Sequence, residues 1–415
     1  MNKQFALKIF EGFSIERWND LVRPFDLVEM DKDAEKMVLA YIIGKYEESR
    51  GIPIDWEWMI YASLFDLLRK IALCDIKSPV QRLIKEEYPE EFIKLNEWVL
   101  EQYRDLIQDQ DIFSKFTLYV GKTSGTIPFS QGQEQTARVF RAAHKYSTMR
   151  ELEMISMVNE ETRLEKIKKE VNADLQSLLD LKGLQMLMTK QKPYDFLLRI
   201  EQLRFQTRWN QTPRVPRTSV LGHCFFTAIL TLLFMHEGGT KVCGKRLYNN
   251  FFSALFHDLP EAVTRDIISP VKQATHGLPS IVKKIEDKIV AQELVPFMED
   301  FYLDEILYFT SDEFQNRIRK DNKTVHVKFE ELNEKYNSDE FNPVDGALVR
   351  LADHYSALLE ADASIRYGIT SKQLEDGRMN LLKAYPFGTK INGMDAFMLF
   401  DAFNSDKTGQ RLLNF

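Results

Sequence analysis

The chain has 415 residues, of which 44% are hydrophobic and 28% charged, with a net charge of −7. This length exceeds what one typical core can organise, so two domains are expected, and the scattered lysines and arginines indicate no nucleic-acid-binding face. The N-terminus lacks the apolar stretch of a signal peptide, no apolar run reaches roughly 18 residues, and the three cysteines form no CxxC pair. We therefore expect no membrane span and a location in the reducing cytoplasm.

Few chain breakers and many Leu, Glu, Lys and Arg residues predict an all-α fold. In the first half, apolar spacing predicts helices over residues 32–43, 56–73 and 89–107, a loop over 121–132, and then continuous helix over 136–188. The charged middle of that last stretch is expected to link the halves as a solvated helix. In the second half, helices are predicted over 220–236, 248–257, 279–298 and 344–366, with a poorly patterned segment over 311–342 and an aromatic-rich covering tail over 371–415.

The first half of the sequence is similar to the second. Arg17-Trp18-Asn19 recurs as Arg208-Trp209-Asn210, a shift of 209 − 18 = 191 residues. The same gap-free shift holds over about 75 residues, which is hard to produce by chance. We therefore predict a tandem duplication, with domains over residues 1–188 and 189–415. Further pairs at this shift are Phe5 and Phe196, Ile9 and Ile200, Arg23 and Arg214, Leu64-Phe65 and Leu255-Phe256, and Ser78-Pro79-Val80 and Ser269-Pro270-Val271.

Four residues of the second half are candidate ligands of one metal ion. His223 stands at the head of an apolar helix, and His257 and Asp258 end the next helix. Asp353 lies on the last strongly patterned helix, within the sequence LVRLAD. Two imidazoles and two carboxylates suit a borderline to hard divalent cation and leave coordination positions open. Each residue alone is a weak signal, but the order H…HD…D, with the doublet extended to HDxxExxTxD, is specific.

At these motifs the sequence resembles the HD-domain metal-dependent phosphohydrolases, and among them most closely the bacterial 5′-deoxynucleotidases, which dephosphorylate deoxyribonucleoside 5′-monophosphates. The resemblance covers roughly residues 196–370. It implies that His223, His257, Asp258 and Asp353 bind a divalent cation (Mn, Co, Mg, Ni, Fe or Zn). It also implies that Glu261, three positions after Asp258, is the catalytic acidic residue that transfers a proton.

Substrate contacts are implied in the same way. Arg208 and Trp209 match an Arg-Trp pair fifteen residues before the first metal-binding His, since 223 − 208 = 15. The Arg would clamp the phosphate with its planar guanidinium, and the Trp would bound the sugar. Arg217 is a second candidate for phosphate binding. Asp266 matches an Asp that contacts the sugar.

Several features leave these substrate assignments open. Arg17-Trp18 and Asp75 occupy the equivalent positions of the first half, so Trp209 and Asp266 could equally have structural roles. Where the family often has an acidic residue before the first metal-binding His, this chain has Gly222. These differences bear on the identity of the substrate more than on metal binding.

The first half lacks the residues that bind the metal. At the shift of 191, Lys32, Asp66 and Leu67 replace the two His ligands and Asp258, and at a later shift of 210 Ala143 replaces Asp353. Lys70 stands in place of Glu261. Ammonium, leucine and alanine side chains cannot ligate a divalent cation. We expect a metal-free HD-like domain that either mimics the second subunit of a dimer or keeps a nucleotide-sized regulatory pocket. Whether the whole chain forms a homodimer stays open.

The leading interpretation is therefore a phosphomonoesterase acting on a small nucleotide. Deoxynucleoside triphosphohydrolases share the same four ligands, so a triphosphate substrate is a competing interpretation. A non-catalytic nucleotide-binding regulator is the alternative outside enzymes, and the intact ligand set with Glu261 argues against it. Alarmone hydrolases carry HDxxED, whereas Ala262 follows Glu261 here. Dinuclear HD enzymes need extra histidines before the final Asp, where only His276 and His326 lie.

Overall fold

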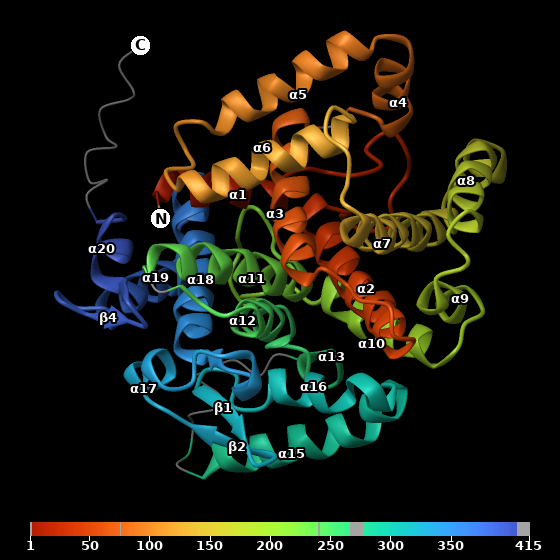
Figure 1. Ribbon diagram of the computed structural model, residues 1–415. Coiled ribbons are helices and arrows are strands. Elements are labelled where there is room, and N and C mark those ends of the chain that lie inside the picture. The colour runs from red at the N-terminus through yellow and green to blue at the C-terminus, as the bar shows by residue number, and fades with distance from the viewer. Residues whose placement is uncertain (1, 75, 240, 266–274, 276, 405–415) are drawn as a thin grey trace, which may run out of the picture.

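The computed structural model describes residues 2–74, 76–239, 241–265, 275 and 277–404. The predicted all-α fold is confirmed, because helices build the core and the strands of the described residues form two small sheets (Figure 1). One sheet has the order β2-β1-β3, and the other pairs β4 with β5. The strands are β1 (Asn316–Lys320), β2 (Lys323–His326), β3 (Val344–Asp345), β4 (Lys390–Ile391) and β5 (Met394–Asp395).

The helices of the first half include the three predicted over residues 32–43, 56–73 and 89–107 and three that were not predicted, over residues 3–10, 78–87 and 110–124. They are α1 (Lys3–Phe10), α2 (Glu29–Ser49), α3 (Trp56–Leu73), α4 (Ser78–Glu87), α5 (Pro89–Tyr103), α6 (Gln110–Ser124), α7 (Gln131–Ser156), α8 (Glu161–Gln176) and α9 (Lys182–Met188).

The continuous helix predicted over residues 136–188 is wrong, because α7, α8 and α9 are separate helices. The break after α7 is held by Asn159, whose side chain donates to the carbonyl of Ile155 and accepts the N–H of Val22. The charged residues of this segment are largely exposed, as predicted, but its apolar side is packed against the first half. Helix α8 packs against α7 and buries three apolar residues, Leu164, Val171 and Leu175.

The second half begins with α10. Its helices are α10 (Lys192–Phe205), α11 (Val220–Glu237), α12 (Gly244–Phe256), α13 (Glu261–Thr264), α15 (Leu278–Glu293), α16 (Asp300–Thr310), α17 (Phe329–Glu334), α18 (Gly346–Arg366), α19 (Lys372–Ala384) and α20 (Ala396–Asp401). The poorly patterned segment over 311–342 contains the β1–β2 hairpin, which the sequence analysis missed. The alternation of apolar and polar residues is weak there because two consecutive residues of β1, Arg317 and Ile318, are both buried. The guanidinium of Arg317 donates to the carbonyls of Tyr308 and Phe309.

Helix α11 is the centre of the molecule. It packs against α12 and α18 of its own half and against α2 of the first half, and Figure 1 shows it between α3 to α6 on one side and α15, α16 and the hairpin on the other. Among the described residues, α11 is the one helix long and apolar enough to cross a membrane, yet 89% of that span is buried inside the protein. It therefore has the burial expected of a core helix.

Two loops that lie 191 residues apart have the same local geometry. An isolated bridge joins Glu16 to Val28, and its counterpart joins Thr207 to Ser219. The tryptophan within each loop has the same left-handed backbone, with φ 55° in both places. A positive φ is uncommon for a bulky residue, so its occurrence at matching positions reflects a shared loop conformation.

Candidate metal centre

Three helices bring the predicted metal ligands together. His223 lies in the first turn of α11, His257 and Asp258 directly follow α12, and Asp353 lies on α18. Nε2 of His223 is 3.0 Å from Oδ1 of Asp353 and 3.9 Å from Oδ2 of Asp258. Nε2 of His257 is 3.2 Å from the same Asp258 oxygen. All four side chains therefore face one small space, and His223, His257 and Asp353 have ligand atoms within 4.8 Å of one another.

The two imidazoles are held in orientations that suit a metal. Nδ1 of His257 is 2.7 Å from the carbonyl oxygen of Ala254, so this nitrogen carries the proton and donates. Nε2 is a buried atom without a hydrogen-bond partner, and it faces Oδ2 of Asp258 at 3.2 Å. Burial acts to lower the pKa of this imidazole, but the charge of Asp258 holds it well above its ordinary value, so a bound cation would take the place of a proton on Nε2. Nδ1 of His223 is likewise 3.0 Å from Oγ of Ser356. Such anchoring of the second ring nitrogen is typical of metal-binding histidines, and the donor set fits a divalent cation.

Both carboxylates of the cluster are kept ionised. Burial acts to raise the pKa of Asp258, but His257, His223 and Arg208 outweigh it and lower that pKa to about 2. Burial opposes ionisation of Asp353 too, and there His223 and Arg208 hold the pKa well below its usual range. The centre is therefore a pair of anions that a cation can bridge.

Arg208 faces this cluster. Its Nη1 is 3.7 Å from Oδ2 of Asp258 and its Nη2 is 3.7 Å from Oδ1 of Asp353, while Nε is 3.3 Å from Glu360. The neighbouring Trp209 donates its indole N–H to Glu360 at 2.8 Å. Glu360 thus orients both members of the predicted Arg-Trp pair.

Sequence reasoning missed Glu360. It lies on α18 two helical turns after Asp353, since 360 − 353 = 7, and so on the same face of the helix. Its carboxylate is buried, which acts to raise its pKa, but Arg208 and Arg214 lower the pKa to about 2. The seven-residue spacing was the available signal, but an acidic residue in a helix is too common to single out.

A thiol was also missed. Cys224, next to His223, forms a second group with His257 and Asp258 in which all ligand atoms lie within 4.8 Å. The thiol is buried, and burial raises its pKa. Cys224 shares this second group with His257 and Asp258 but does not belong to the group formed by His223, His257 and Asp353. It is therefore a soft donor beside the predicted ligands.

The remaining predicted residues have different positions. Glu261 begins α13, its carbonyl accepts from Nε2 of Gln206 at 2.8 Å, and its charge contributes to the raised pKa of Arg208. Arg217 is exposed and donates to Oγ1 of Thr207 at 3.2 Å. Asp266 lies outside the described residues.

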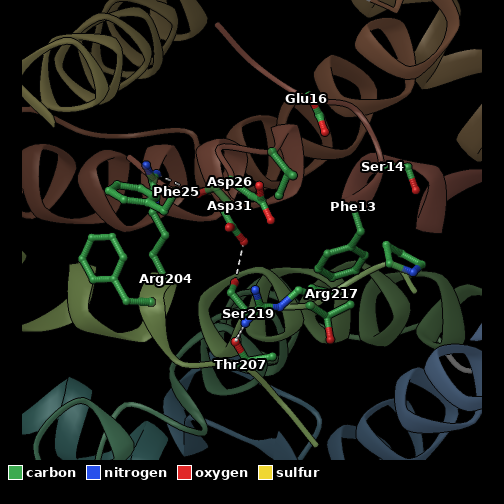
Figure 2. Close-up of a pocket in the computed structure, with 14 residues that line it drawn as sticks. Phe13, Ser14, Glu16, Phe25, Asp26, Asp31, Arg204, Thr207, Arg217 and Ser219 are labelled. Atoms are coloured by element: carbon green, nitrogen blue, oxygen red, sulfur yellow. Dashed lines mark hydrogen bonds between the residues drawn. The ribbon is translucent and has the colours of Figure 1, made fainter. Parts of the chain in front are cut away.

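Arg217 lines a separate cavity of about 420 Å³ between the two halves, which Figure 2 shows in close-up. Across that cavity, Ser219 at the start of α11 donates to Oδ1 of Asp31 on α2 at 2.5 Å. None of the four predicted metal ligands lines this cavity. The structure therefore does not bring Arg217 to the metal cluster.

In the first half, lysines occupy the equivalent place. Lys32 donates to the carbonyl of His144 at 2.8 Å, and Asp66 lies 2.6 Å from Lys36 and 3.3 Å from Lys70. These ammonium groups neutralise the carboxylate that stands where His257 does in the second half. Among the described residues, groups able to hold a metal ion lie in the second half alone.

The counterpart of Asp353 follows from matching hydrogen bonds. Trp18 donates its indole N–H to Glu151 at 2.9 Å, as Trp209 does to Glu360, and 360 − 151 = 209. At this shift Asp353 corresponds to His144, not to the alanine before it.

Comparison with known proteins agrees with this geometry. Residues 200–382, which include all four predicted ligands, match the family model described as HD domain. This match supports placing the second half in the HD-domain superfamily, whose members are typically metal-dependent phosphohydrolases. No curated protein matched the chain.

Proposed function

We propose that this protein is a metal-dependent nucleotidase that releases phosphate from nucleoside 5′-monophosphates, deoxyribonucleotides among them. The observation that carries the proposal is the position of Arg208, whose two terminal nitrogens each lie 3.7 Å from a ligand carboxylate. A phosphate bound at the centre would meet this guanidinium and the cation together. That arrangement suits a phosphomonoester, because the planar fork can hold two phosphate oxygens.

Each residue has a role in this proposal. A divalent cation, when bound, supplies Lewis-acid polarisation of the phosphate and lowers the pKa of water. Arg208 binds and orients the phosphate, and Glu360 holds Arg208 in place. Glu261, which begins α13 three residues after the ligand Asp258, moves the proton.

We also propose that the chain arose by tandem duplication and that the first half has lost the metal centre. The support is the shared set of bridge, left-handed tryptophan and Trp–Glu hydrogen bond at matching positions. The lysines around Asp66 provide internal positive charge where the second half requires a cation from solution.

The activity is tested with a panel of nucleoside mono- and triphosphates in the presence of Mn²⁺, Co²⁺ or Mg²⁺, with inorganic phosphate and triphosphate measured separately. We expect phosphate from monophosphates. Absence of any release from protein that contains metal would overturn the proposal, and triphosphate as product would replace the nucleotidase by a triphosphohydrolase.

Two variants locate the activity. Asp258→Ala is expected to lose both bound metal and turnover, whereas Asp287→Ala, which removes an exposed carboxylate on α15, should retain both. Glu261→Gln should retain metal and lose at least about a hundredfold in kcat, the usual contribution of a general acid or base. Full turnover by Glu261→Gln would show that another group moves the proton.

A further inference from the structure

A second cavity, of about 330 Å³, opens in the first half between α3 and α6. Four aromatic side chains form its walls: Trp58, Tyr61, Phe65 and Tyr119. The volume is within the range of small-molecule sites, and aromatic walls with a few polar groups are typical of them. Flat rings on several sides favour a ligand that is itself planar and aromatic.

Two lysines from α6 bring positive charge to this cavity. Lys122 donates to the neutral side-chain oxygen of Gln133, and Lys115 pairs with the exposed Asp111. Of the two carboxylates that line the cavity, Asp55 is engaged as the cap of α3, where Oδ1 accepts the N–H of Trp58 at 2.9 Å.

The other carboxylate of the cavity, Glu57, is exposed to solvent. Water screens its charge, whereas Lys115 and Lys122 are both partly buried against the aromatic walls. Lys115 also lies over the ring of Tyr61, with Nζ 5.0 Å from the ring centre. Lys122, which donates to the neutral side chain of Gln133, is therefore the cation of this cavity best placed to meet an anionic group on the ligand.

The cavity lies beside the part of the first half that corresponds to the metal centre. The hydroxyl of Tyr119 is 3.4 Å from Oδ1 of Asp66, and Asp66 stands 257 − 66 = 191 residues before His257. Because Lys36 and Lys70 pair with Asp66, this place cannot take a divalent cation. A ligand bound here would meet no centre able to hydrolyse it.

We propose that this cavity binds a ligand with a planar aromatic ring and an anionic group, the chemical class of nucleoside monophosphates, and holds it unhydrolysed. The ring packs against Trp58, and the anionic group faces Lys115 and Lys122. The hydroxyl of Tyr61 is also 2.5 Å from Nε2 of His236, on the helix that carries His223, so the site has a direct contact with the second half.

The test is isothermal titration of the full chain with AMP in EDTA, so that binding is measured apart from any metal-dependent hydrolysis and does not depend on the proposed activity. We expect saturable binding of AMP. The double variant Lys115→Ala/Lys122→Ala should bind AMP about tenfold more weakly, the loss expected for two partly exposed ion pairs, and should bind adenosine like the unaltered chain. Trp58→Leu should weaken both ligands.

Lys94→Ala is the matched control, because Lys94 is an exposed lysine on α5 that pairs with Glu91, and binding should not change. Absence of AMP binding to the unaltered chain would overturn the proposal. Binding that neither Trp58→Leu nor the lysine double variant alters would overturn it as well. The lysine side chains are partly exposed, so the double variant keeps the test decisive if Trp58→Leu does not fold.

Discussion

Glu360 shows at the scale of single residues how the fold and the candidate chemistry depend on one another. Its buried carboxylate accepts hydrogen bonds from Trp209 and from Oγ1 of Thr218, each at 2.8 Å, and pairs with Arg208. The hydrogen bond from Trp209 to Glu360 has a counterpart in the first half, where Trp18 donates to Glu151, so this bond has a structural role. Arg208, in contrast, faces the metal ligands Asp258 and Asp353. Within the Arg-Trp pair, the Arg is therefore the member that faces the metal ligands.

Loss of the Glu360 carboxylate is expected to be costly. Glu360→Ala would leave the partly buried Arg208 without its nearest carboxylate and remove the acceptor of Trp209 and Thr218, a loss of about 2–4 kcal/mol. Urea unfolding of the variant should show a decrease of this size in the free energy of unfolding. Glu330→Ala, on the exposed side of α17, should change it by less than about 0.5 kcal/mol. A neutral effect of Glu360→Ala would show that Arg208 does not depend on this carboxylate.

Asp31 predicts an unusual dependence of stability on pH. Burial raises its pKa to about 6, although Arg204 and Ser219 act to lower it, whereas an unfolded Asp has a pKa of about 4. Because the folded state holds the proton more tightly, this group contributes stability at low pH that is lost as the pH rises from about 4 to 6.

Asp31→Asn should remove that loss. We expect the variant to be more stable than the unaltered chain by about 1–3 kcal/mol at pH 7.5, and the two to converge near pH 4, in urea unfolding at both values. A variant that is less stable at pH 7.5 would show that the ionised carboxylate is needed between α2 and α11.

At the scale of elements, the start of α11 depends on a close approach to the first half. A Cβ atom on Gly222 would lie 2.5 Å from Oδ1 of Asp31 and 2.8 Å from Cε1 of Phe13. This explains in physical terms why a residue without a side chain stands at position 222. It also connects the interface between the halves to His223, the next residue.

Gly222→Ala is therefore expected to destabilise the chain by about 1–3 kcal/mol, the usual cost of overpacking, and to weaken metal binding because α11 must shift. Gly132→Ala is the matched control. Nothing lies within 4 Å of a Cβ at that exposed position of α7, so the substitution should be neutral or stabilising by up to about 1 kcal/mol. Unfolding curves and metal titration of both variants measure the difference.

The sequence predicted those elements whose signal is local. Apolar spacing located α3 and α11 closely, and the H…HD…D order found the four residues that α11, α12 and α18 bring together. It failed where tertiary contacts decide. The break at Asn159 depends on Val22, far away in the chain. The buried strand β1 carries Arg317, whose guanidinium donates to carbonyls at the end of α16. Glu360 has no distinctive sequence pattern, because its role depends on a hydrogen bond from Trp209, 151 residues earlier in the chain.

Across the whole molecule, the two halves differ in the charged groups that surround equivalent positions. The second half gathers His223, His257, Asp258 and Asp353 around one small space, with Arg208 facing both carboxylates. The first half surrounds Asp66 with lysines that satisfy it internally. Among the described residues, groups of ligand atoms for a metal ion lie in the second half alone, so we predict one metal ion per chain and none in the first half.

Metal content and position test this claim most directly, by elemental analysis and anomalous scattering from crystals of the metal-loaded protein. We predict one ion per chain, within bonding distance of His223, His257, Asp258 and Asp353, and none in Asp258→Ala. An ion beside Asp66, or a metal-loaded chain without an ion at the His223 cluster, would contradict it.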